Sequence, residues 1–529
     1  MNDVSLNAHP ASNYFLVLAI GLVLIYQAYA IGRIPSYPTD DDGAYAAAGY
    51  QIWQTGQPGV SGYKNVAGMG DNIYALGRIG AAFQGVFMNL FGVGIVTALL
   101  PSFFAGIVCL LLVFMLGREL WGITAGLLAA LLLSLSGTFF SASHSGRPDL
   151  LVTVFLLAAL WLVASASDGV PHWRLCFSGL VMGMSGDAHP NGFLLAPLPL
   201  VFWVLLRRPN WKQLVQGILF FGIGGAIGIG YWLFTHYRVN PDGFRRQSSV
   251  HGLATHGVKL LDHGVFGSLA LELDRYLNWF WKARGHRHLP EGLFVLGSAC
   301  LLLWKGGRTG RALVGVWLVF FLIAAALMSN SFGWYLIFAW PLFALWIARA
   351  VQLIEWKWLA RGAVTVAIVV YLFNLGLWHW KASRETPMRS WVAELRTVIP
   401  ASASVFASAG LWFAFWDRDF THEPYLPFRE IEARLYPETG PTGWEAEQQK
   451  HNWRYIAAYG NLRQMLDPEF PIEQMLAVEP WRNRVDEVMK ARNFSLKHCS
   501  VVTRFRSASE TLTVFRVNDT KQVPATKLP

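Results

Sequence analysis

Charged side chains are scarce in this chain. Of its 529 residues, 14% are charged and 54% are hydrophobic, whereas about a quarter of an ordinary soluble protein is charged. The scarcity is uneven, because residues 1–381 hold 39 of the 76 charged side chains and residues 382–529 hold the other 37. A single soluble globule is therefore excluded. We predict an integral membrane domain over 1–381 and a soluble domain over 382–529.

Cysteine is also rare, and metal-binding patterns are missing. Cys109, Cys176 and Cys300 fall in apolar segments, and Cys499 is alone in the predicted soluble domain. A lone cysteine cannot form an internal disulfide, and no pair has the CxxC spacing of a metal site. The six histidines between 236 and 288 lack metal-ligand spacing as well. We expect no metal and no other cofactor.

Long apolar runs are what the chain has in abundance. A membrane-spanning helix needs about 20 such residues, and the runs predict about eleven of them in a mostly α fold. The first is expected to be retained, because the N-terminus lacks the basic segment and cleavage site of a signal peptide. The predicted spans are 13–32, 95–117, 123–140, 147–166, 174–190, 191–206, 213–236, 291–304, 312–328, 333–351 and 361–380.

Basic residues in the short loops predict the orientation of these spans. Five basic loops alternate with poorly charged ones, and the positive-inside rule places them in the cytoplasm. They hold Arg118, Arg174, Arg207, Arg208, Lys212, Lys305, Arg308, Arg311, Arg349, Lys357 and Arg361. The segments 33–94, 141–146 and 237–290 and the soluble domain then lie outside. The net charge of +10 is thereby explained without nucleic acid, which is not an expected partner.

The outer segments have patterns of their own. Residues 44–54 and 78–92 show the periodicity of helices lying in the membrane interface, with a packed hairpin as the alternative. The glycine-rich stretch 222–230 lies in an apolar span and predicts close helix packing. The soluble domain reads as a small α/β unit. Its expected elements are a helix at 387–398, strands at 403–408, 500–506 and 511–517, and helical stretches near 444–466 and 480–493.

Three clusters of charged residues fall at the predicted outer face, where ionisable side chains near a membrane are functional candidates. The first is Asp40, Asp41 and Asp42; a solvated turn capping the next helix is the alternative. The second runs over 143–149 and holds His144, Arg147 and Asp149. Asp149 follows Pro148 and could simply cap a helix. The planar guanidinium of Arg147 is suited to binding a phosphate.

The third cluster is GlyAspAlaHisProAsnGly at 186–192. Its Asp187 and His189, followed by proline and glycine, suggest a broken helix that lines a cavity. A buried Asp–His pair that joins two helices is the alternative. The basic outer loop 237–290, which includes Arg245 and Arg246, is expected to attract an anionic lipid head group.

The same residues carry a resemblance to a known superfamily. The stretch ThrAspAspAspGlyAlaTyr at 39–45 resembles the acidic motif that follows the first span of GT-C glycosyltransferases. The stretch SerHisSerGlyArgProAspLeuLeu at 143–151 resembles their second motif. HisProAsnGly at 189–192 and the segment 334–341, which contains Tyr335, match looser signatures. The similar branch contains dolichyl-phosphate-mannose protein mannosyltransferases and the bacterial lipid A aminoarabinose transferase, and the resemblance covers roughly residues 10–380.

This resemblance implies roles for individual residues. The catalytic aspartate of the family falls on Asp41, with Asp42 as its acidic neighbour and Asp40 as an added carboxylate. The second acidic position falls on Asp149, and Arg147 is the arginine of that motif. The sequence AspAlaHisProAsnGly stands where the aminoarabinose transferases have a lysine, which argues against that activity. The remaining substrate- or phosphate-binding candidates are His144, Asp187, His189, Arg245, Arg246 and Tyr335.

The function implied is transfer of a monosaccharide from a polyprenyl-phosphate donor to an acceptor hydroxyl on a lipid, glycan or protein. The transfer would invert the anomeric carbon at the periplasmic face of a bacterial inner membrane, without a metal. A transporter or flippase of lipid-linked sugars is the alternative, although inverted repeats and mid-membrane charges are not evident. A scaffold would leave the acidic clusters unexplained. An oligosaccharyltransferase would be expected to carry a larger outer domain.

Overall fold

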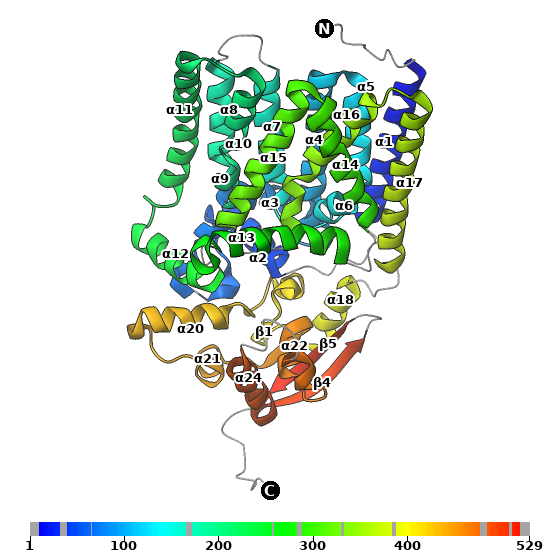
Figure 1. Cartoon of the computed structure of the whole chain (residues 1–529). Helices are drawn as coiled ribbons and strands as arrows, with labels where there is room; N and C mark the ends of the chain where they lie inside the picture. The colour runs from blue at the N-terminus through cyan, green and yellow to red at the C-terminus, as the bar shows by residue number, and fades with distance from the viewer. Residues whose placement is uncertain are drawn as a thin grey trace.

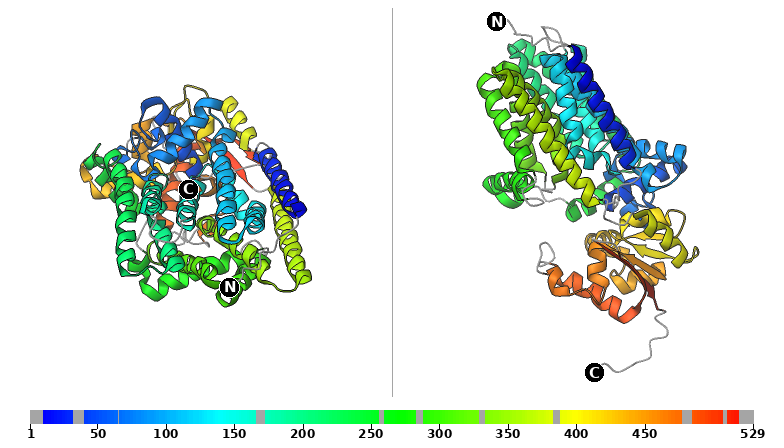
Figure 2. Two further views of the ribbon diagram at one scale, coloured as in Figure 1. Left: turned by 90° about the horizontal axis from the view of Figure 1, so that it is seen from above. Right: turned by 90° about the vertical axis from the view of Figure 1, so that its right-hand side faces the viewer.

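The chain forms a tall helical bundle with a small mixed domain at one end (Figure 1). The computed structural model describes residues 10–31, 40–64, 66–165, 172–255, 259–282, 288–328, 333–382, 388–476, 484–506 and 510–518. The right-hand view of Figure 2 shows the small domain below the bundle, joined to it through a layer of short helices.

Each of the eleven predicted spans falls on an apolar helix or on a broken pair of helices. These elements are α1 (Pro10–Ile31), α4 (Ile95–Trp121), α5 (Ile123–Leu135) with α6 (Gly137–Ser143), α7 (Asp149–Ala164), α8 (His172–Ser185), α9 (Asn191–Leu195) with α10 (Leu198–Arg207), α11 (Trp211–Thr235), α14 (Leu289–Lys305), α15 (Gly307–Leu327), η5 (Gly333–Phe338) with α16 (Trp340–Leu353), and α17 (Lys357–Ala382).

These helices make the chain an integral membrane protein. Within the described ranges, five helices are long and apolar enough to cross a bilayer, and a sixth span results if α5 and α6, bent by 70°, are counted together. The bend lies at Ser136, whose side chain accepts a hydrogen bond from the backbone N–H of Phe139 and so begins a new helix. The other apolar helices are shorter, so the predicted total of eleven spans stays a prediction.

Segments that the charge pattern assigned to opposite sides of the membrane lie at opposite ends of the bundle. At one end, Lys305 pairs with Glu355 at 2.7 Å, and Arg349 lies over the Trp121 ring. Both contacts join predicted cytoplasmic loops. The opposite end carries the small domain (Figure 1). The grouping of loops is as predicted, and the compartment that each end faces stays a prediction.

A layer of short helices separates the bundle from the small domain. It contains α2 (Asp40–Thr55), α3 (Arg78–Phe91), α12 (Pro241–Thr255) and α13 (Lys259–Leu277), with the single turns η1 (Ser61–Tyr63), η2 (Val66–Gly68) and η3 (Tyr74–Leu76). The helices predicted at 44–54 and 78–92 are thus confirmed. They pack against each other closely, because a Cβ at Gly49 would meet the Gln84 side chain at 2.7 Å.

The small domain is built on a five-stranded sheet in the order β2-β1-β3-β5-β4. Strands β1 (Val405–Ala407), β2 (Phe420–His422) and β3 (Tyr455–Ala458) are parallel to one another. Strand β5 (Thr511–Val517) is antiparallel to both of its neighbours, β3 and β4 (Cys499–Arg506). The surrounding helical elements are α18 (Met388–Val398), η6 (Ala409–Leu411), α19 (Trp412–Phe415), α20 (Tyr425–Leu435), η7 (Pro437–Thr439), α21 (Trp444–His451), α22 (Gly460–Leu466), α23 (Ile472–Leu476) and α24 (Val485–His498).

The α/β character of this domain, its first helix and its last two strands are confirmed. The helical stretch predicted near 444–466 is wrong in its middle, because β3 separates α21 from α22. Strand β3 is nearly fully buried between β1 and β5, and a short buried strand has no alternating pattern that would distinguish it from a helix. Strand β2 was not predicted for the same reason.

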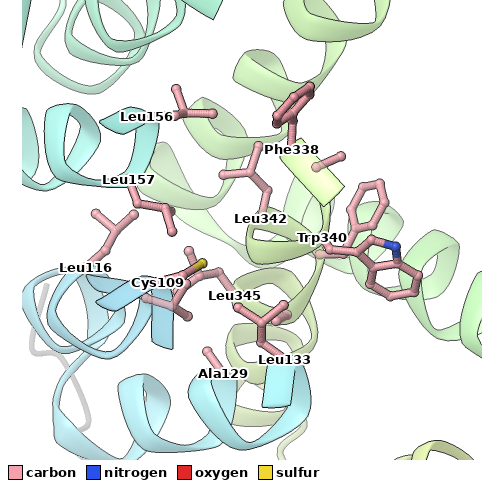
Figure 3. Close-up of a cluster of buried hydrophobic side chains, with 14 of the residues drawn as sticks. Cys109, Leu116, Ala129, Leu133, Leu156, Leu157, Phe338, Trp340, Leu342 and Leu345 are labelled. Atoms are coloured by element: carbon pink, nitrogen blue, oxygen red, sulfur yellow. The ribbon is translucent and has the colours of Figure 1, made fainter. Parts of the chain in front are cut away.

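Two hydrophobic cores organise the molecule. The first runs through the bundle, where Cys109, Leu116, Leu133, Leu156 and Leu345 pack together from four different helices (Figure 3). The second combines residues of the outer layer, the adjoining ends of α1 and α4, and residues 388–517 of the small domain. The small domain therefore shares its core with the layer beneath the bundle. The division at residues 381 and 382 stays a prediction.

Glycines let two membrane helices approach each other in the bundle. A Cβ at Gly224 of α11 would lie 1.8 Å from the backbone oxygen of Cys176 in α8, and one at Gly228 would lie 2.7 Å from the backbone of Gly183. Close contact of this kind is what small residues permit in membrane helices. The predicted packing role of the 222–230 stretch is confirmed.

Candidate active site

The first part of the site is the N-terminal turn of α2, which contains two described acidic side chains. The side chain of Asp41 is 56% exposed, whereas Asp42 is buried. Asp42 Oδ1 accepts a hydrogen bond from the backbone N–H of Gly146 at 2.8 Å. The side chain of Asp40 lies outside the part of the chain that the structure describes. Asp42 thus fixes the start of α2 against the 143–149 segment.

The second part is Arg147, which lies between α6 and α7 and joins two carboxylates. Its Nη1 donates to Asp41 Oδ2, and its Nε donates to Asp149 Oδ2 at 2.7 Å. Its own carbonyl accepts a hydrogen bond from Ser102 Oγ at 2.7 Å, which anchors the loop to α4. The two predicted motifs, more than 100 residues apart in sequence, therefore meet at one point.

Two charged side chains of this cluster, Arg147 and Asp149, are buried. Arg147 is 8% exposed and Asp149 is 4% exposed, and a buried guanidinium needs opposite charges to offset its desolvation. The Oδ1 atom of Asp149 is buried and has no hydrogen-bond partner among the described residues. Asp149 is also the first residue of α7, so its carboxylate lies at the positive end of that helix.

Aromatic rings border the cluster. The guanidinium of Arg147 lies 5.8 Å from the centroid of the Tyr335 ring. The His189 ring lies 6.2 Å from that of Tyr335 and 6.4 Å from that of Tyr45. Tyr45 is a site residue that the sequence reasoning did not single out, although it closes the first motif four positions after Asp41. Three of the predicted residues, Arg147, His189 and Tyr335, and the missed Tyr45 are therefore neighbours.

A small crevice opens beside Arg147. Its volume is about 10 Å³, which is room for about one water molecule. Its lining comes from α2, α3, α4, α7 and the 146–148 turn, and includes Tyr45, Gln84, Ser102, Arg147 and Leu151. One side is thus polar and charged and the other apolar. The crevice therefore borders the charged cluster, but its volume is below that of a phosphate group.

Asp187 lies fully buried in a different set of contacts. Its Oδ1 accepts the backbone N–H of Arg78 at 2.9 Å and lies 2.5 Å from Nε2 of His236. The alternative of an Asp–His pair that joins helices fits these contacts, but the partner is His236 and not His189. Asp187 holds the start of α3 against the end of α11. Its role in substrate binding stays a proposal that these contacts do not favour.

His144, Arg245 and Arg246 are also engaged elsewhere. The Nδ1 of His144 contacts the Phe140 carbonyl at 2.8 Å, and its Nε2 contacts the Gln27 carbonyl at 3.1 Å. Arg245 donates to the hydroxyl of Tyr237. Arg246 pairs with Glu432 of the small domain at 2.7 Å. Within the described ranges, no three histidine, cysteine, aspartate or glutamate side chains gather into a metal-binding group.

Comparison with known proteins agrees with this arrangement. The family model described as dolichyl-phosphate-mannose-protein mannosyltransferase matches residues 79–232, which include Arg147 and Asp149. The structure of ArnT from Cupriavidus metallidurans bound to undecaprenyl phosphate matches with a TM-score of 0.61 at 12% identity, over 96% of this chain and 98% of that one. The fold of this chain is therefore similar to that of ArnT, a GT-C glycosyltransferase. No curated protein sequence matches it.

The GT-C fold extends to a second group of solved structures. The Archaeoglobus fulgidus oligosaccharyltransferase AglB, in complex with an inhibitory peptide and a dolichol-phosphate, matches with a TM-score of 0.52 at 13% identity, over 97% of this chain and 75% of that one. The resemblance to the branch of protein mannosyltransferases and ArnT is thereby confirmed. At these identities the structures establish the fold alone.

Proposed function

We propose that this GT-C protein transfers a monosaccharide from a polyprenyl-phosphate donor to an acceptor hydroxyl, with inversion at the anomeric carbon. The observation that carries the proposal is the convergence of Asp41, Arg147 and Asp149 at one end of a membrane bundle. One partly exposed carboxylate stands beside a buried cation there, so a base and an anion-binding group are adjacent. Arg147 supplies positive charge for a phosphate, as charge stabilisation at a departing group requires.

In the proposed reaction, Asp41 acts as the general base. It takes the proton from the acceptor hydroxyl while the oxygen forms a bond to the anomeric carbon. The bond from that carbon to the phosphate oxygen breaks, and its electron pair leaves with the polyprenyl phosphate, which stays bound near Arg147. General-base catalysis of this kind contributes about 10²–10⁴-fold to a rate. The unpartnered Oδ1 of Asp149 is placed to accept a hydrogen bond from a substrate hydroxyl.

The proposed substrates follow from the surroundings of the cluster. The hydrocarbon chain of a lipid carrier can lie against the apolar helices of the bundle. Two of the structures with a similar fold contain lipid phosphates, namely undecaprenyl phosphate in ArnT and dolichol-phosphate in AglB. Arg245 and the aromatic residues His189 and Tyr335 stay proposed binding residues. The positive-inside pattern supports a periplasmic active site in a bacterial inner membrane. The acceptor is a lipid, a glycan or a protein.

The decisive test is Asp41→Asn, compared with Asp71→Asn as a matched control on the same outer segment. The amide keeps the shape of the carboxylate but cannot accept the proton, so sugar transfer should fall by at least about 10²-fold. Transfer is measured by mass spectrometry of envelope glycolipids and glycans, and folding by thermal unfolding in detergent. Asp71 is exposed, so its variant should retain activity. Full transfer by Asp41→Asn would refute the assignment.

A transporter or flippase is separated from this proposal by the fate of the sugar. Purified protein in vesicles should release polyprenyl phosphate from a labelled lipid-linked sugar only when an acceptor is present. Movement of the intact labelled lipid across the vesicle membrane, without cleavage and without dependence on Asp41, would instead favour transport.

A further inference from the structure

The first turn of α2 is held from two sides. On one side, Asp42 and Asp41 contact Gly146 and Arg147 in the membrane domain. On the other side, Gly43 lies directly against η6 of the small domain, where an added Cβ would be 2.1 Å from the Ala409 carbonyl oxygen. A real Cβ never approaches an oxygen so closely. Only glycine therefore allows the turn that carries the carboxylates to lie in this gap.

Further contacts of the same helix reach the small domain. The Tyr50 ring, two turns after Gly43, lies 5.3 Å from the Trp416 ring and 6.2 Å from the Trp412 ring. Tyr50 packs against the second hydrophobic core, which contains Trp412 and spans the outer layer and the small domain. Apolar contacts therefore hold α2 against the small domain beyond its first turn.

Neighbouring loops make the docking specific. The His422 ring fills the space that a side chain at Gly62 would need, since a Cβ there would lie 1.7 Å from its Cδ2 atom. Lys64 pairs with Asp419. Glu432 Oε1 accepts the backbone N–H of Ala67 at 2.9 Å and pairs with Arg246 at 2.7 Å. These contacts come from two outer segments and meet a single face of the small domain.

From this arrangement we infer that the small domain is a positioning part of the active site: through η6 it presses the first turn of α2 against Arg147 and fixes the placement of Asp41 and Asp42. Gly43 and Ala409 are the positioning residues. The inference rests on the proposed function for its catalytic consequence. Catalysis is sensitive to such placement, because a displacement of about 1 Å can cost about 10²-fold in rate.

The test compares Gly43→Ala with Gly21→Ala. Both substitutions add one methyl group to a helix, but a Cβ at Gly21 meets nothing within 4 Å. Gly43→Ala should lower kcat by about 10–100-fold with little change in the KM for the donor, because the groups that bind phosphate remain. Gly21→Ala should behave as the unchanged protein. Unchanged kcat in folded Gly43→Ala would overturn the inference.

A readout independent of catalysis separates this inference from the proposed function. Hydrogen exchange of the peptide 40–55 should become faster in Gly43→Ala and stay unchanged in Gly21→Ala. If the unmodified protein transfers no sugar, the proposed function fails, and the exchange result alone decides the positioning claim. Unchanged exchange in Gly43→Ala would reject that claim whatever the activity.

Charge reversal at the interface gives a test that does not add bulk near the carboxylates. Lys64→Glu and Asp419→Lys should each accelerate exchange of the peptide 40–55 and lower kcat, and the double variant should restore both. Glu355→Lys reverses an exposed acid that is also paired with a lysine, at the opposite end of the bundle, and should change neither. A double variant that is no better than the single ones would contradict the proposed docking role.

Discussion

Two aspartates near this membrane edge lie in different surroundings. Asp41 is partly exposed and adjoins a buried arginine, whereas Asp187 is fully enclosed and accepts hydrogen bonds from the backbone of Arg78 and from His236. In sequence, Asp41 stands between two other aspartates, whereas Asp187 stands between a glycine and an alanine. The difference in exposure arises from the elements that pack around each side chain, so burial separates the proposed general base from a carboxylate that is held in a buried pair.

The contacts of Asp187 lead to a stability prediction. Asp187→Ala leaves the N–H of Arg78 and the ring of His236 without their acceptor, at a cost of about 1–3 kcal/mol for each buried group. The melting temperature in detergent should fall clearly, and Asp187→Asn, which keeps an acceptor oxygen, should lose less. The KM for the donor should be little changed in the folded fraction. A large rise in KM at unchanged melting temperature would instead place Asp187 in substrate binding.

At the scale of elements, the membrane helices are held at distances that small residues set. The faces of α8 and α11 meet through Gly179, Gly183, Gly224 and Gly228. Hydrocarbon chains of lipid compete equally for apolar side chains, so close backbone approach is what favours helix contact in a bilayer. Glycines elsewhere on the same helix, such as Gly222 and Gly230, have open space around them.

This contrast gives a matched pair of substitutions on α11. Gly224→Leu and Gly228→Leu force the two helices apart and should destabilise the protein by about 1–3 kcal/mol or more. Gly222→Leu and Gly230→Leu add the same side chain where a Cβ has no neighbour within 4 Å and should have little effect. Thermal unfolding and size-exclusion chromatography in detergent report the outcome. Equal destabilisation by all four substitutions would show that α8 and α11 are not packed as described.

At the scale of the whole molecule, the small domain and the outer layer form one folded unit. The His422 ring is buried at their boundary, against Gly62 and 5.3 Å from the Tyr63 ring. Burial, with a smaller contribution from Lys64, lowers the pKa of His422 to about 3. The docked arrangement therefore contains a neutral histidine, although a free imidazole has a pKa near 6.5.

This burial predicts a dependence of stability on pH. The unfolded chain binds a proton below about pH 6.5 and the folded chain does not, so stability falls as the pH drops from about 6.5 toward 3. At pH 5 the loss from this residue is about 2 kcal/mol. His422→Leu should flatten the fall in melting temperature between pH 6.5 and 5, whereas His263→Leu, at an exposed position, should not. An unaltered pH profile in His422→Leu would contradict the neutral buried state.

The amino-acid sequence by itself determined the membrane domain, the helical layer and the pairing of two motifs at one face. Long apolar runs and basic loops are local patterns, and each can be read without knowing what a segment touches. The identity of the main candidates, Asp41, Arg147 and Asp149, followed from their position at the ends of such runs and from the resemblance. Each of these features depends on whether a segment is apolar or charged, and this can be read from the residues of the segment itself.

Tertiary structure alone decided which partners these residues meet. Tyr45 joins the site, Asp187 pairs with His236, and β3 interrupts a predicted helix because it is covered on both sides by other strands. The docking of the small domain on α2 through Gly43 has no local signal at all, since one glycine among 50 looks like any other. Contacts between segments hundreds of residues apart depend on shape, which becomes defined only when the chain has packed.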